Sequence, residues 1–349
     1  MKVSIGTKIK EGPWGGGNLF AINLKNYLVD SGHKVVHDLV DDDIDIILIT
    51  EPRKTSESSA FTDRDVKKYR DLVNNDVLII HRINECDERK GTNYVNKYLI
   101  EANKVADETV YVSKWIQDLY MQQGINSTKN VIYAGADNEI FNSTNFVPWD
   151  GLSKISIVTH HWGGNWNKGF ETYSHLDRLI ESKKWKDKIE FTYIGNLPPN
   201  FKFCNTNVVK PLSGKKLSNL IKESHLYITG SLNEPSGNHH IEAAQCGLPI
   251  LYLESGGTTE YCIGFGIGFK KNNFETKLEL IIENYDQFVK KMQDYPHSAR
   301  KMSKEYLTLF EVMKKNKAYY LNLRSNKKVN LISKKIHLKS RAIKKKLNF

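Results

Sequence analysis

The stretch from Leu226 to Gly257 constrains the fold more than any other part of the chain. Its first four residues form an apolar run that predicts a buried parallel strand, and residues 248–253 predict the next strand. Between them, a turn over residues 230–237 leads into a predicted helix over 238–246, which Gly247 ends. This strand–turn–helix–strand order is typical of an α/β domain built on a parallel sheet.

Two carboxylates flank the start of that predicted helix. Glu234 lies in the turn at the carboxyl end of a strand, where open α/β sheets bind ligands, and Glu242 lies about one turn inside the helix. The free N–H groups at a helix start suit a diphosphate, and Gly237 lets the backbone approach it closely. Each carboxylate can then bind a pair of vicinal hydroxyls. Taken alone, the same positions also fit a loop charge and a charge that complements the helix dipole.

The wider spacing resembles the motif of family-four (group 1) retaining glycosyltransferases, which have the GT-B fold. The shared pattern is Glu-x7-Glu at Glu234 and Glu242, Ala-Ala-x-x-Gly-x-Pro-Ile over residues 243–250, and Gly-Gly-x-x-Glu over 256–260. The resemblance implies an α/β protein with two Rossmann-like doubly wound domains facing a central cleft. It also implies that Glu234 contacts the hydroxyls of the donor sugar and Glu242 the ribose of the nucleotide.

A glycine-rich loop follows the first predicted strand. Gly15, Gly16 and Gly17 do not have the GxGxxG spacing, which argues against a nicotinamide or flavin site. Three consecutive glycines still allow close contact with a phosphate or sugar, and the resemblance implies that this loop faces the donor. Asn18 is the predicted cap of the helix that comes next.

A second strand-to-helix loop carries Lys168, where a cation can neutralise a departing diphosphate. The family usually has an arginine about six residues earlier, and this chain has Trp162 there. Lys168 must therefore act with backbone amides, with Asn165, or with the neighbouring His160 and His161. The predicted contacts of the nucleotide-sugar are Gly15, Gly16, Gly17, Lys168, Glu234, Ser236, Gly237, Asn238, His239 and Glu242.

In the first half of the chain, residues 77–80 predict a buried strand whose carboxyl end delivers His81 into the cleft. A single histidine is usually structural, but family members often place one here in contact with the donor sugar or the acceptor. The predicted catalytic residues are His81, Lys168 and Glu234, and weaker candidates on the acceptor side are Arg82, Asn84 and Asp87.

No metal site is predicted. The acidic residues 41–45 resemble the DxD metal motif of the other large glycosyltransferase fold, but they precede the strand at 46–49 and so lie at the wrong edge of the sheet for a ligand. The tandem His160 and His161 have no accompanying carboxylate or cysteine in their loop. We therefore expect no metal and no cofactor, the nucleotide-sugar being the donor substrate.

The 349 residues suffice for two domains, predicted as an acceptor-side domain over 1–148 and a nucleotide-sugar domain over 149–310. A helix over 311–326 is expected to cross back to the first domain, and residues 327–349 form a basic amphipathic tail.

Nine of the lysines and arginines that give the chain its net charge of +11 lie in this tail, which has no acidic residue. Its apolar residues interleave with lysines, as in helices on anionic membrane surfaces. Disorder and nucleic-acid binding remain alternatives for the tail, but nucleic acid is not a predicted partner of the protein, since no aromatic-interleaved basic groove accompanies it.

The sequence thus predicts a metal-independent, retaining glycosyltransferase that moves a sugar to a glycan or lipid-linked acceptor, as in polysaccharide synthesis. Scattered cysteines and the absence of an apolar leader or spanning segment indicate a cytoplasmic protein, peripheral to the inner face of the membrane through its tail. The alternatives are a nucleotide-sugar hydrolase or epimerase of the same fold, and an inactive nucleotide-sugar or glycan-binding protein. The base, the sugar and the acceptor are not identified, although loops such as residues 50–63 are expected to select the acceptor.

Overall fold

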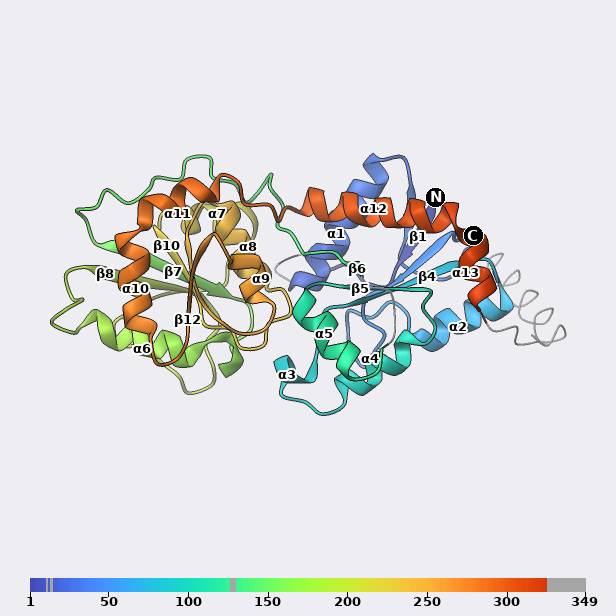
Figure 1. The fold of residues 1–349 in the computed structure, drawn as a ribbon, viewed down its shortest axis with the longest axis horizontal. Helices are drawn as coiled ribbons and strands as arrows, with labels where there is room; N and C mark the ends of the chain where they lie inside the picture. The colour runs from blue at the N-terminus through green and yellow to red at the C-terminus, as the bar shows by residue number, and fades with distance from the viewer. Residues whose placement is uncertain (11, 13–14, 126–129, 325–349) are drawn as a thin grey trace.

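The computed structural model describes residues 1–10, 12, 15–125 and 130–324. Two parallel six-stranded sheets lie side by side, with helices on both faces of each (Figure 1). One sheet comes from the N-terminal half of the chain and the other from the C-terminal half. The expected pair of doubly wound α/β domains is confirmed, and we name them the N-domain and the C-domain.

The N-domain sheet has the strand order β2-β1-β3-β4-β5-β6. Its strands are β1 (Lys2–Ile5), β2 (Lys34–Val36), β3 (Ile46–Ile49), β4 (Leu78–Ile83), β5 (Glu108–Tyr111) and β6 (Asn130–Val131). The helices between them are α1 (Gly16–Asp30), α2 (Asp63–Leu72), α3 (Asp87–Lys90), α4 (Val95–Asn103) and α5 (Lys114–Gln122). The chain runs outward from β1 to β2 and then returns to β3, so the strand order reverses beside β1.

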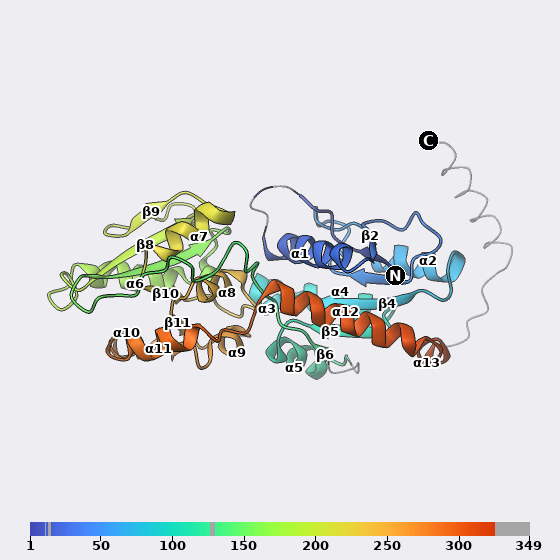
Figure 2. The same cartoon turned by 90° about the horizontal axis from the view of Figure 1, so that it is seen from above.

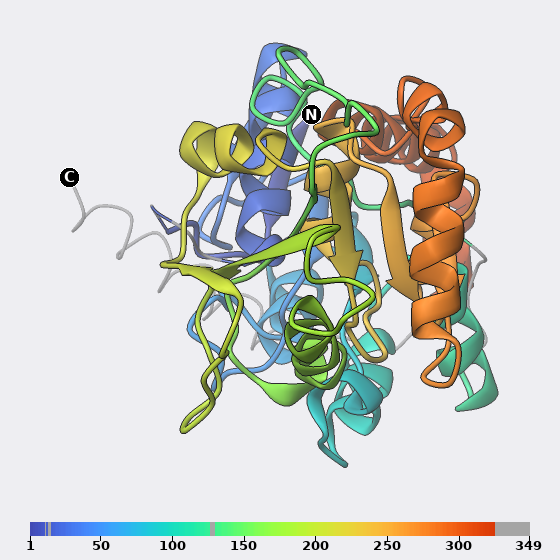
Figure 3. The same ribbon diagram turned by 90° about the vertical axis from the view of Figure 1, so that its left-hand side faces the viewer.

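The C-domain sheet is also parallel and six-stranded, with the order β12-β11-β10-β7-β8-β9. Its strands are β7 (Ile155–His161), β8 (Ile189–Gly195), β9 (Asn207–Val209), β10 (Leu226–Thr229), β11 (Ile250–Leu253) and β12 (Gly266–Phe269). Its helices are the short 3-10 helix η1 (Trp166–Lys168), α6 (Phe170–Ile180), α7 (Gly214–Lys222), α8 (Asn238–Gln245), α9 (Thr258–Cys262), α10 (Phe274–Glu283) and α11 (Tyr285–Met292). In Figure 3, where this domain faces the viewer, α10 and α11 (orange) flank its strands. Here the strand order reverses between β7 and β10.

Apolar residues follow one another along the central strands, without alternating with polar ones, because helices cover both faces of each sheet. Every residue of β3, β4 and β10 is buried. Neighbouring residues of β10 enter different cores, since Tyr227 packs in one apolar cluster and Ile228 in another. Alternation across a strand places these clusters on opposite faces of the sheet.

The last helices return to the N-domain (Figure 2). They are α12 (Ala299–Lys315) and α13 (Lys317–Leu323), and α12 packs against α1. Tyr306 of α12 joins the N-domain core, with its ring centroid 5.3 Å from that of Phe20. The return therefore begins at Ala299, earlier than the predicted boundary at 311, because the apolar residues of α12 face α1. The predicted tail, residues 327–349, lies outside the described residues.

A second contact joins the domains through Glu260 of α9. Its carboxylate accepts hydrogen bonds from the backbone N–H groups of Lys114 and Trp115 at 2.7 and 2.6 Å, and the Tyr133 hydroxyl donates to it at 3.0 Å. The C-domain thus caps the start of α5 in the N-domain. Within the described ranges, no helix is both long and apolar enough to cross a membrane.

Candidate active site

A cavity of about 860 Å³ lies between the two domains. Its walls include the loops that follow β1, β4 and β6 in the N-domain sheet and β7, β9 and β10 in the C-domain sheet. All of these loops leave the carboxyl ends of parallel strands, where α/β sheets bind ligands. The volume falls within the range of roughly 300–1,000 Å³ that is typical of small-molecule sites.

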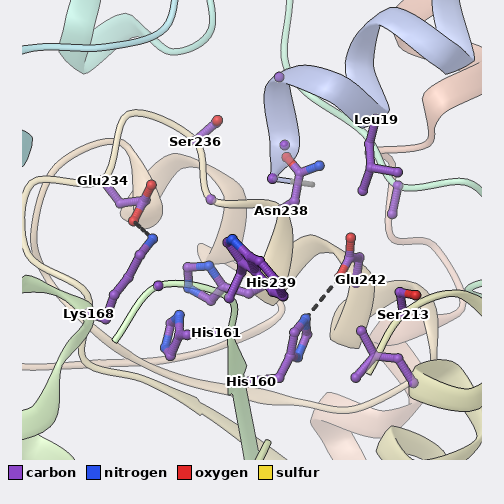
Figure 4. A pocket seen from close by; sticks show the side chains of 18 of the residues that line it. Leu19, His160, His161, Lys168, Ser213, Glu234, Ser236, Asn238, His239 and Glu242 are labelled. Atoms are coloured by element: carbon purple, nitrogen blue, oxygen red, sulfur yellow. Dashed lines mark hydrogen bonds and ion pairs between the residues drawn. The ribbon is translucent and has the colours of Figure 1, made fainter. Parts of the chain in front are cut away.

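Glu234 binds two cations in this cavity, one from each domain. Its Oε1 accepts a hydrogen bond from Nε of Arg89 on α3 at 2.9 Å, and its Oε2 accepts one from Nζ of Lys168 at the end of η1, also at 2.9 Å (Figure 4). Only 10% to 15% of each side chain is exposed. Burial alone would raise the pKa of Glu234, but the charges of Lys168 and Arg89 outweigh it and hold that pKa well below its ordinary value. Two cations share one carboxylate, so the group carries a net positive charge.

The topology of the sheet brings Lys168 to Glu234. Their loops follow β7 and β10, which pair directly at the point where the strand order reverses. Glycines shape the Glu234 loop. Gly237 has φ 77°, and a Cβ there would lie 2.6 Å from Cε1 of His240. A Cβ at Gly256, which has φ 63°, would lie 2.6 Å from the backbone nitrogen of Glu234. Only glycine fits these positions without displacing the loop.

Helices α1 and α8 both begin at the cavity. Each has a glycine at its N-cap, Gly15 or Gly237, without a capping side chain and without an acidic residue in its first turn. The two starts lie close together, since a Cβ at Gly16 would be 2.9 Å from Oδ1 of Asn238 (Figure 4). Uncapped N–H groups and the positive ends of two helix dipoles therefore face one space, which favours an anion.

Glu242 lies on the opposite side of the cavity from Glu234 and pairs with His160 (Figure 4). The distance from Nε2 of His160 to Oε2 of Glu242 is 2.8 Å, and the Tyr227 hydroxyl lies 3.2 Å from Nδ1 of the same imidazole. Both paired side chains are buried against the protein on all sides but the cavity. The histidine fixes the orientation of the carboxylate, and Oε1 of Glu242 has no hydrogen-bond partner in the described part of the chain.

Three more buried histidines surround this pair. Nε2 of His161 lies 2.7 Å from the Tyr173 hydroxyl, and Nε2 of His239 lies 2.9 Å from Oγ1 of Thr229. Burial lowers the pKa of His161, His239 and His240, that of His240 to about 3, so these imidazoles are neutral near pH 7. Among the residues that the structure describes, no group of three or more His, Cys, Asp or Glu side chains is arranged to hold a metal ion.

The structure brings the residues predicted to contact the nucleotide-sugar to one place. Those that line the cavity are Gly15, Gly16, Gly17, Lys168, Glu234, Ser236, Gly237, Asn238, His239 and Glu242. Trp162 and Asn165 also line it, and half of the Trp162 side chain is exposed.

His81 is not brought to the cavity. Strand β4 continues to Ile83, so His81 lies inside the strand, where it is fully buried and pairs with Thr109 in the sheet. Its Nδ1 lies 2.9 Å from Oδ1 of Asn103, and burial lowers its pKa to about 4. The expectation that the strand delivers His81 into the cleft is therefore corrected.

Of the weaker N-domain candidates, Arg82 and Asn84 line the cavity. Asp87 does not, because its carboxylate accepts hydrogen bonds from the backbone N–H groups of Val95 and Asn96 at the start of α4. Sequence reasoning missed Arg89. The available signal was the charged run Asp87–Lys90 four residues after the end of β4, but nothing local distinguishes Arg89 from Lys90 within it.

No family model and no curated protein matches this chain. Solved structures do. A glycosyltransferase from Rickettsia africae is 14% identical, with 90% of this chain and 99% of that chain covered and a TM-score of 0.63. Sucrose-phosphate synthase from Thermosynechococcus elongatus is 12% identical, with the same coverage and a TM-score of 0.62. HepE from Anabaena, solved with UDP and glucose, is 13% identical, with 92% and 99% covered and a TM-score of 0.57.

The chain has the GT-B fold. The two six-stranded parallel sheets and the return of the last helix to the N-domain belong to this architecture, and the cavity occupies the space between its two domains.

Proposed function

We propose that this protein is a metal-independent, retaining glycosyltransferase that moves a sugar from a nucleotide-sugar to a glycan or lipid-linked acceptor. The observation that carries the proposal is Glu234, held between Arg89 and Lys168 in a cavity that also holds the Glu242–His160 pair. Glu234 would bind the sugar of such a donor, and Glu242 would bind its ribose. The positively charged region between the two carboxylates would bind the diphosphate. Structural similarity to a protein from Rickettsia africae that is named as a glycosyltransferase, and to HepE, which was solved with UDP and glucose, supports the proposal.

In this proposal the nucleotide occupies the C-domain side of the cavity. Glu242, oriented by His160, accepts hydrogen bonds from the ribose hydroxyls. The diphosphate lies at the starts of α8 and α1, where N–H groups are uncapped, and Gly237 allows it to approach the backbone. The sugar then lies toward Glu234.

Arg89 has a specific part in the proposed site. The C-domain loop holds one lysine, Lys168, and Trp162 occupies the position where the family that the sequence resembles usually has an arginine. Arg89 supplies a guanidinium to the same carboxylate from the N-domain. When a diphosphate binds, Arg89 and Lys168 can turn to its oxygens, and Glu234 becomes available to the hydroxyls of the sugar.

The chemistry is mainly electrostatic. Cleavage of the bond between the sugar and the diphosphate leaves an oxocarbenium-like sugar and adds negative charge to the diphosphate, which Arg89, Lys168 and the two helix starts stabilise. By resemblance, the acceptor hydroxyl attacks on the face that the diphosphate leaves, and a donor phosphate oxygen takes its proton. The proposal names no protein nucleophile and retains Lys168 and Glu234, but not His81, as catalytic residues. A cytoplasmic location and attachment to an anionic membrane through residues 327–349 stay predictions.

Thermal unfolding in the presence of UDP-, GDP- and ADP-glucose, with a chelator and no added metal, tests the proposal. A ligand that binds only the native state at about 100 times its Kd stabilises the protein by roughly 2.7 kcal/mol. We expect a rise in Tm with one nucleotide class, a smaller rise for Glu242→Ala, and a full rise for Glu190→Ala, which removes an exposed carboxylate of the same domain. No rise with any nucleotide would contradict the proposal. Donor breakdown without an acceptor would favour the hydrolase or epimerase alternative.

A further inference from the structure

A second cavity, of about 360 Å³, adjoins the first on the N-domain side. The two cavities share the glycine loop at 15–17, Arg82 near the end of β4, and Asn84 and Glu85, which follow that strand. All described residues that line the second cavity belong to the N-domain, and several come from residues 50–58. Its volume suffices for a monosaccharide-sized group, and its walls carry hydroxyl groups, such as those of Thr50 and Ser58, and side-chain amides, such as that of Asn84, that suit sugar hydroxyls.

Most charges around this second cavity are compensated by a neighbour. Arg53 donates from Nε to Oε1 of Glu51 at 2.7 Å, and Nζ of Lys10 lies 2.7 Å from Oε2 of Glu57. Glu85, which lies on the shared wall, pairs with Lys90 at 3.0 Å. These pairs leave little net charge to attract a ligand.

Lys8, which also lines this cavity, is exposed to solvent, so Arg82 is the buried exception. Only 4% of the residue is exposed, and its Nε has no hydrogen-bond partner. Within the described chain the guanidinium makes no ion pair with a carboxylate. It lies over the ring of Phe20, with Cζ 4.0 Å from the ring centroid. Burial lowers the pKa of Arg82 below its ordinary value, and the groups that counteract this are the hydroxyls of Tyr306 and Tyr261.

A buried arginine without a carboxylate is unusual, because removing the charge from water is costly and buried arginines are almost always paired. The contact with the Phe20 ring offsets only part of that cost. Arg82 itself lines both cavities, at the wall that they share. The position is therefore suited to an oxyanion that arrives with a ligand.

We propose that the second cavity is the acceptor subsite and that Arg82 binds a phosphate or carboxylate group carried by the acceptor. This inference rests on the proposed glycosyltransferase function. The donor diphosphate has its own cations in Arg89 and Lys168 at the C-domain wall, whereas the second cavity is formed by the N-domain. An anion held by Arg82 lies where the two cavities meet, so the acceptor is a sugar whose charged group is close to the hydroxyl that reacts.

The test measures binding of glucose 6-phosphate, glucuronate and glucose by saturation-transfer NMR at constant ionic strength, with and without saturating UDP. We expect wild-type protein to bind at least one anionic sugar about tenfold or more tightly than glucose, because hydrogen bonds to a charged group are stronger than neutral ones. A preference for the phosphate or for the carboxylate identifies the acceptor group. Arg82→Gln should abolish the preference, Arg82→Lys should retain part of it, and Arg64→Gln, an exposed arginine on α2 outside both cavities, should leave it intact.

Each of the following outcomes would overturn the proposal. Equal binding of all three sugars by wild-type protein excludes an anion subsite and needs no variant to interpret. Displacement of the anionic sugars by UDP, together with weaker UDP binding in Arg82→Lys, would assign Arg82 to the donor diphosphate. If the protein binds the anionic sugars but none of the nucleotides, the second cavity is not the acceptor subsite of a glycosyltransferase. UDP binding without any anion preference would overturn this inference alone and leave the proposed function standing.

Discussion

Nε of Arg89 and Oε1 of Glu234 lie 2.9 Å apart, although 145 residues separate them and they belong to different domains. Two further hydrogen bonds support this contact. The side-chain amide of Asn233 donates to the carbonyl of Glu88 at 3.1 Å, and that of Asn167 donates to the carbonyl of Arg89 at 3.2 Å. Helix α3 is thus bound to the C-domain beside Lys168, and the proposed sugar site is complete only when both domains contribute.

Arg89→Ala should slow sugar transfer strongly, by about 100-fold or more, since removal of a group that stabilises developing charge typically costs roughly 2.7–4 kcal/mol. Arg89→Lys should recover part of the rate, because it keeps the charge but loses the guanidinium geometry. Steady-state kinetics with the donor found by thermal unfolding measure both, and Arg64→Ala is the control. An unchanged rate in Arg89→Ala would show that the arginine only joins the domains.

Glu260→Ala should lower Tm without removing nucleotide binding. The carboxylate caps α5 across the domain boundary, and loss of a helix cap costs about 0.5–2 kcal/mol. For large domains this corresponds to roughly 2–4 °C per kcal/mol. Glu223→Ala, at the exposed end of α7, should leave Tm nearly unchanged. A nucleotide Kd that rises as much as for Glu242→Ala would instead place Glu260 at the ligand.

Stability should fall as the pH falls below about 6.5, in part through His240. Its folded-state pKa is about 3, against an ordinary value of 6.5, so between these values the unfolded chain binds one more proton than the folded protein. Stability therefore rises with pH over this window by about 1.4 kcal/mol per unit and is lost on acidification. His240→Phe removes this contribution. The difference in Tm between wild type and His240→Phe should shift in favour of the variant from pH 7 to pH 5, and a constant difference would refute the assignment.

Local sequence signals predicted the part of the fold that carries the site. The apolar run at Leu226–Thr229 coincides with β10, and the predicted helix at 238 begins at Asn238 as α8. These elements follow from short-range chemistry, namely buried apolar runs and glycines at turns. The cap predicted at Asn18 is wrong, however. Helix α1 begins at Gly16, and the Asn18 side chain instead exchanges hydrogen bonds with the backbone of Lys10 at 2.9 and 2.8 Å.

Long-range pairing explains what the sequence could not show. His81 was expected at a strand end, but pairing of Ile83 with Tyr111 on β5 extends β4 beyond it, and such pairing depends on register between distant segments. The partnership of Arg89 with Glu234 depends on how two domains face each other. Neither has a periodicity or a local motif that could reveal it.

The most direct test of the central account compares the binding of a nucleoside diphosphate with that of its glucose conjugate by calorimetry, using the nucleotide that stabilises the protein best. Glu242→Ala should weaken both ligands by the same factor, roughly tenfold, because it removes a charge-assisted hydrogen bond to the shared ribose. Glu234→Ala should reduce the affinity for the glucose conjugate relative to the diphosphate, because only the conjugate has the sugar. An unchanged ratio in Glu234→Ala, with unchanged diphosphate binding in Glu242→Ala, would contradict the assignment of the two carboxylates.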